Sequence, residues 1–134
     1  MTVGKEGVAA GPELGDLVCR ELCRAGIPAY VMRPEATGRP GARVEADDSQ
    51  GEHVGGLYVR WSAPGLAAAA VKAVTERADP AAPEWEHHAE VALLMRTALI
   101  GILRLAGFSA VPAEDVDDLA EGDVYVHAGT PSRS

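Results

Sequence analysis

A chain of 134 residues can form one ordinary domain with a hydrophobic core, but it is too short for two. Its content of 47% hydrophobic and 24% charged residues excludes a largely disordered protein. The formal net charge of −8 opposes a polyanion-binding surface, so we expect no nucleic acid partner.

The first half of the chain is expected to contain one helix followed by three strands. Residues 1–12 are rich in glycine and lack periodicity, so we expect a disordered tail before a single domain over 13–128. Leucine and valine side chains fall on one face of a helix over 12–25, and Gly26 ends it. Segments rich in strand-forming residues follow, separated by turn residues. The expected strands are 27–33, 42–47 and 56–61.

The second half is expected to contain two helices and two short strands. Ser62 suits the N-cap of a helix over 63–78, and the sequence DPAAP then interrupts the chain. A longer helix over 84–106 ends before Gly107, where a left-handed residue is expected. The remaining expectations are strands over 108–111 and 123–128 and a disordered tail over 129–134.

The helix over 84–106 is the most apolar segment and is expected to form the core. Glu90, Thr97 and Arg104, seven residues apart, leave only a narrow polar stripe. Such a helix must be covered on more than one side, by its own domain and by a second copy of the chain. We therefore expect a homodimer formed through this helix or through the open face of the sheet, with Gly101 allowing close approach.

The two halves of the chain resemble one another. Each helix before a short strand ends in alanine and glycine, at Gly26 and at Gly107. Further on, GGLYVR over 55–60 aligns with GDVYVH over 122–127. This similarity has two explanations, a duplicated helix–strand–strand unit or chance. Both predict an α+β two-layer sandwich, with a mostly antiparallel sheet and helices packed on one face.

Strand alternation predicts which side chains share a face of that sheet. Leu57, Val59, Val124 and Val126 are expected to face the helices, together with Val44. Arg43 and Glu45 then face the opposite way. This helix-free face is either ordinary solvated surface or a contact face for a partner or ligand. Its candidate residues are Tyr58, Arg60, Tyr125 and His127.

A second polar cluster lies at the start of the long helix. Glu84 and His87 share a helix face with the spacing of carboxylate-bridged metal sites, and His88 follows. Such sites need a second Glu-x-x-His pair, which the sequence lacks, so we expect no metal. The cluster is interpreted as a solvated first turn with Trp85 packed on the core, or as a weak candidate for a partner or ligand contact.

Cys19 and Cys23 are the only cysteines and stand one helical turn apart. Since cysteine is among the most often buried residues, we expect two buried, unbridged thiols. No disulfide framework is indicated.

The sequence contains no P-loop, no dinucleotide-binding fingerprint and no nucleophile elbow. It also has no apolar leader at its start and no clean apolar run of membrane-spanning length. We therefore expect a small, non-catalytic cytoplasmic domain without cofactors, which binds itself and another protein and not a membrane. The alternative is a small enzyme or ligand-binding protein, with its site on the open sheet face or at the start of the long helix.

Overall fold

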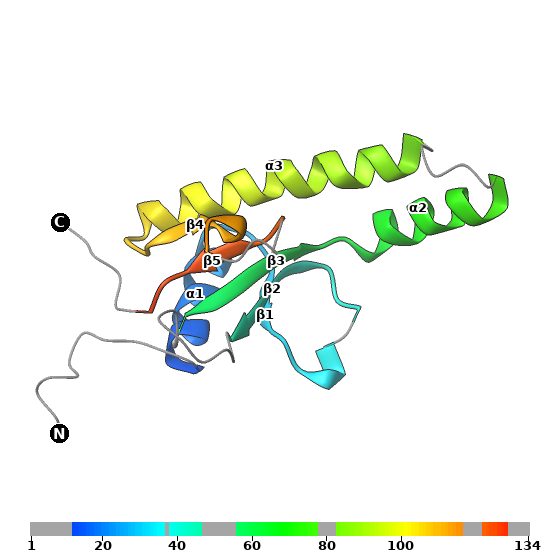
Figure 1. Ribbon diagram of the computed structural model, residues 1–134. Helices are drawn as coiled ribbons and strands as arrows, with labels where there is room; N and C mark the ends of the chain where they lie inside the picture. The colour runs from blue at the N-terminus through cyan, green and yellow to red at the C-terminus, as the bar shows by residue number, and fades with distance from the viewer. Residues whose placement is uncertain (1–11, 37, 47–55, 78–82, 117–121, 129–134) are drawn as a thin grey trace, which may run out of the picture.

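A computed structural model of the chain describes residues 12–36, 38–46, 56–77, 83–116 and 122–128. It has an α+β fold, as the sequence predicts, with three helices beside a five-stranded sheet (Figure 1). The helices are α1 (Pro12–Arg24), α2 (Pro64–Arg77) and α3 (Pro83–Leu105). The strands are β1 (Ala29–Val31), β2 (Gly41–Ala46), β3 (Leu57–Ser62), β4 (Ala110–Pro112) and β5 (Val124–Val126), and two 3-10 turns are η2 (Pro34–Ala36) and η3 (Ala113–Asp115).

The sheet has the strand order β1-β2-β3-β5-β4. β1 pairs parallel with β2, while the other three pairs are antiparallel, so the prediction of a mostly antiparallel sheet is confirmed. The outer strands β1 and β4 are shorter than predicted, and each follows a helix directly. Most of the expected terminal tails, 1–12 and 129–134, lies outside the described residues, although α1 begins at Pro12.

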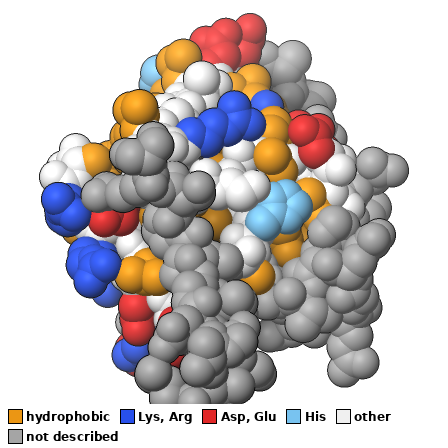
Figure 2. Space-filling view, turned by 90° about the vertical axis from the view of Figure 1, so that its left-hand side faces the viewer, with side chains coloured by type: hydrophobic (Ala, Val, Ile, Leu, Met, Phe, Trp, Pro, Cys, Tyr) orange, Lys and Arg blue, Asp and Glu red, His pale blue; other side chains and the backbone are white. Residues whose placement is uncertain are grey.

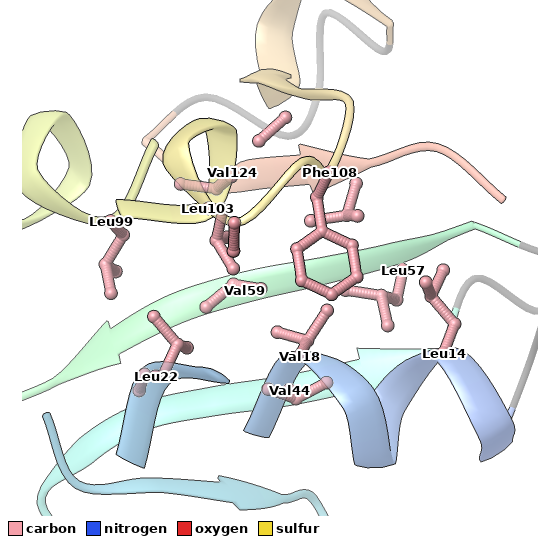
Figure 3. Close-up of a cluster of buried hydrophobic side chains, with 14 residues drawn as sticks. Leu14, Val18, Leu22, Val44, Leu57, Val59, Leu99, Leu103, Phe108 and Val124 are labelled. Carbon is pink, nitrogen blue, oxygen red and sulfur yellow. The ribbon is translucent and has the colours of Figure 1, made fainter. Parts of the chain in front are cut away.

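The core lies between the sheet and the two helices α1 and α3, which both cover the same face (Figure 3). Leu14, Val18 and Leu22 come from one face of α1, four residues apart, and are fully buried. Leu99 and Leu103 of α3 are also fully buried and complete the helical layer. The inward side chains of the strands pack against them, as strand alternation predicts: Val44, Leu57, Val59, Val124 and Val126.

Both covering helices end in the same hydrogen-bond arrangement. Gly26 has a φ of 90° and Gly107 a φ of 98°, so each helix closes with a left-handed glycine, as predicted. After the first, the Ile27 N–H donates to the Leu22 carbonyl at 3.0 Å. After the second, the Phe108 N–H donates to the Leu103 carbonyl at 3.0 Å. Both acceptor carbonyls belong to leucines of the core, so the two turns fix where β1 and β4 begin relative to the core.

α2 differs from the other helices because it packs mainly on α3. Its buried side chains are the alanines Ala70 and Ala73, and the two helices form an antiparallel hairpin that extends past the end of the sheet (Figure 1). The expectation that Trp85 packs on the core is therefore wrong. Trp85 lies on the part of α3 beyond the sheet and is half exposed.

The sheet covers only one side of α3. Leu94 and Leu105 on this helix are 70% and 87% exposed, and Leu93 is 52% exposed. At the end of the molecule where α3 finishes, hydrophobic, basic and acidic side chains are interspersed over the surface (Figure 2). No described helix is long and apolar enough to cross a membrane.

The expectation that both cysteines are buried is also wrong. Both thiols are unbridged, as predicted, but Cys23 is exposed and Cys19 is only half-buried. Each follows a core residue of α1, Val18 or Leu22, by one position, and is therefore turned about 100° away from the core. Burial raises the pKa of the Cys19 thiol to about 11, with smaller contributions from Cys23 and Asp16.

We predict that a thiol reagent at pH 8 labels Cys23 much faster than Cys19. The raised pKa keeps the Cys19 thiol protonated at this pH, and the thiolate is the reactive form. Mass spectrometry of the labelled peptides gives the two rates. In urea both residues should react quickly, and equal rates in the folded protein would contradict the assignment.

We also predict that Leu103→Ala lowers the free energy of unfolding by about 2–5 kcal/mol, because it removes a fully buried side chain from the core. Leu93→Ala on the same helix is the matched control and should change it by less than about 0.5 kcal/mol. Urea denaturation followed by circular dichroism measures both.

Candidate functional site

The four candidate residues on the sheet lie on one face, as predicted. Tyr58 stands opposite Tyr125 in the β3–β5 register, and their rings meet edge to face with centroids 5.1 Å apart. The His127 ring meets Tyr125 in the same way at 5.0 Å. These three residues therefore form a row of aromatic rings on the side of the sheet away from α1 and α3.

This face is less open than the sequence analysis predicts, because Tyr125 is fully buried. The structure leaves room for its hydroxyl group only because residue 56 is a glycine. A Cβ atom at Gly56 would meet the Tyr125 hydroxyl and would lie 2.8 Å from the Val126 carbonyl oxygen. Tyr125 is thus a packing residue, and the accessible part of the row consists of Tyr58 and His127, which are half-buried.

Arg60 forms the main ion pair of this face. Its Nε and Nη2 donate to the two carboxylate oxygens of Asp123 at 2.8 and 3.0 Å. Asp123 is buried, whereas more than half of the Arg60 side chain is exposed. The hydrogen bonds to Asp123 raise the pKa of Arg60, which stays charged. Asp123 was not among the residues predicted for this face, although it lies in one of the two similar segments, 55–60 and 122–127, that contain the tyrosine pair.

Arg43 lies directly opposite Arg60 on the neighbouring strand. Its Nε is buried and has no hydrogen-bond partner among the residues that the structure describes. Its ion pair with Glu45 is long, at 4.0 Å. Two arginines on adjacent strands repel one another, and the carboxylates of Asp123 and, more weakly, Glu45 offset this repulsion at Arg60.

A second ion pair joins α3 to η3. Arg96 Nη1 donates to both carboxylate oxygens of Glu114, at 2.8 and 2.7 Å. Backbone N–H groups of Glu114 and Gly122 also bind this carboxylate. Its own backbone N–H and Arg96 are the main causes that lower the pKa of Glu114. Neither Arg96 nor Glu114 was among the residues predicted for a site, so this pair was not predicted.

A hollow lies between α3 and the ends of β3 and β5, with a volume of about 200 Å³. We call it the α3–sheet hollow. It brings together Arg60 and His88, which the sequence analysis had assigned to two separate sites. A more open depression of about 490 Å³ continues from it along α3, since the two share His88, Ala92 and Arg96. The polar and small residues that line the hollow are Arg60, His88, Ala92, Arg96, Gly122 and Asp123, and Trp61 also lines it.

The other residues of the helix cluster do not line this hollow. His87 points to the exposed side of α3, and Glu84 is half-buried one turn before His88. The Trp85 and His88 rings lie 6.2 Å apart. Within the described ranges there is no group of three or more His, Cys, Asp or Glu side chains placed to hold a metal ion.

We predict that Arg60→Met lowers the free energy of unfolding by about 1–3 kcal/mol, because it leaves the buried Asp123 carboxylate without its partner. The double variant Arg60→Met/Asp123→Leu should recover most of this loss, since it removes the unpaired charge as well. Urea denaturation of both variants gives the comparison. If the double variant were as unstable as the single one, the ion pair would not be the cause.

Comparison with known proteins finds no matching family model, no similar curated protein and no similar solved structure.

Proposed function

We propose that this chain is a non-catalytic protein-binding domain that acts as a homodimer in the cytoplasm, and that two copies of α3 form the dimer. The observation that carries the proposal is a row of exposed small and apolar residues on the outer side of this helix. We call it the outer stripe, and it consists of Leu94, Ala98, Gly101 and Leu105.

The spacing of the outer stripe supports pairing with a second copy. Its residues are separated by four, three and four positions, so they lie in line on one side of the helix. This order reads the same in both directions, with a leucine at each end and small residues between. An antiparallel copy can therefore set Leu94 against Leu105 and Ala98 against Gly101. A twofold interface requires this kind of self-complementary surface.

Gly101 gives independent support, because no contact among the residues that the structure describes calls for a glycine at this position. Glycine within a helix costs about 1 kcal/mol relative to alanine. A Cβ atom added at Gly101 would meet no atom of the described residues within 4 Å, so their packing does not require a glycine there. Close approach of another helix across this position would explain it.

Charge also favours the antiparallel arrangement. The first part of α3 carries Glu86 and Glu90 on its exposed side, and Arg104 lies in its last turn. An antiparallel partner brings the acidic part of one helix toward the basic end of the other and also opposes their dipoles. A parallel partner would instead place Glu90 beside its own copy.

We expect sedimentation equilibrium at micromolar concentration to give twice the 13.9 kDa mass of the chain. Gly101→Gln should give a folded monomer, because the added side chain is tolerated in the single chain but prevents close approach. Ala68→Gln, at an exposed position of α2, is the matched control and should remain dimeric. A wild-type monomer at tens of micromolar would refute the proposal.

The orientation can be tested separately. Spin labels at Glu86→Cys, in a chain whose two native cysteines are replaced by serine, should lie about 40 Å apart in the antiparallel dimer at 1.5 Å per residue. A parallel dimer would place them within roughly one helix diameter, about 10 Å.

A further inference from the structure

We propose that the α3–sheet hollow binds a small organic monoanion, a carboxylate attached to a compact apolar body. This proposal is independent of self-association, since none of the outer stripe residues lines the hollow. It rests on the shape of the hollow, on the hydrogen-bond donors at its rim and on the charge that surrounds it.

The shape results from one small residue between two large ones. His88, Ala92 and Arg96 are four residues apart and so share the side of α3 that faces the sheet ends. The methyl group of Ala92 leaves a gap between the two longer side chains. Trp61 also lines the hollow, and it packs against the core. The floor is apolar, formed by the core side chains Val59, Leu99 and Val124.

The size of the hollow limits the ligand. A volume of about 200 Å³ corresponds to roughly seven water molecules at ~30 Å³ each. This suits a body about the size of a single aromatic ring. The apolar floor favours such a body, because a ring placed there would remove apolar surface from water.

The rim supplies donors for a carboxylate. Arg96 uses only Nη1 for Glu114, so its Nε and Nη2 have no hydrogen-bond partner within the described part of the chain. These two N–H groups form an edge that can donate to both oxygens of a carboxylate. Less than a fifth of the Arg96 side chain is exposed, so such a bond would be well shielded from water.

The charges at the rim disfavour a ligand with more than one negative charge, because the two arginines of the rim are balanced by two carboxylates. Arg60 is neutralised by Asp123 and Arg96 by Glu114. A phosphate or polyphosphate would meet these two carboxylates without enough uncompensated positive charge to balance them. A monocarboxylate can be bound by the Nε and Nη2 groups of Arg96 alone, so it is the class of anion that this site fits.

The test uses benzoate as the probe and benzamide as its uncharged counterpart. Trp61 lines the hollow, so its fluorescence reports binding once the other tryptophan is removed by Trp85→Phe. We expect a saturable change with benzoate up to millimolar concentration, and an affinity for benzamide that is weaker by about tenfold or more. No saturable response to benzoate, or equal affinity for the two probes, would overturn the proposal.

Two variants locate the site. Ala92→Leu should abolish benzoate binding because it fills the hollow without changing any charge, while Ala69→Leu at an exposed position of α2 should leave binding unchanged. Arg96→Gln should weaken binding by about tenfold or more while the hollow remains. If a folded Ala92→Leu chain bound benzoate normally, the hollow would not be the site. If it failed to fold, unchanged affinity in Arg96→Gln would overturn the assignment of the donor.

Discussion

The burial of α3 against the sheet determines most of the remaining structure. This helix is apolar around most of its circumference, but Leu99 and Leu103 alone are fully buried along it. They meet the core face of α1 and the inward valines of β3 and β5, and this contact sets the position of both helices. Because a two-layer arrangement covers only one side of a helix, the opposite side of α3 keeps its exposed leucines.

The similarity between the two halves of the chain has a geometric counterpart. β3 and β5 pair antiparallel about the Tyr58–Tyr125 pair, with Leu57 opposite Val126 and Val59 opposite Val124. Leu57 thus stands opposite the counterpart of Val59, and Val59 opposite the counterpart of Leu57, which is the pattern of a twofold axis between the two tyrosines. α1 and α3 lie on the same face and end in the same glycine turn, so they fit this relation too. β2 belongs to one half only and interrupts the symmetry.

The fold was largely predictable because it depends on local patterns. Alternation in β3 and β5 identified the inward side chains, and Gly26 and Gly107 marked both helix ends. The candidate site was harder to predict, since its ion pairs join distant residues: Arg60 and Asp123 are 63 positions apart. Arg96 pairs with Glu114 only because the chain turns back over α3 after β4. The burial of Tyr125 also depends on the close approach of Gly56, which strand alternation does not reveal.

The division of α3 into a part above the sheet and a part beyond it has a dynamic consequence. The part above the sheet is anchored by the core. The part beyond the sheet is supported mainly by the alanines of α2, which bury little area. Backbone amides in the part of α3 beyond the sheet should therefore exchange with solvent through local fluctuations. Those near Leu103 should exchange only when the whole domain unfolds. A single continuous helix would then contain two regions of different local stability, with the α3–sheet hollow near the boundary between them.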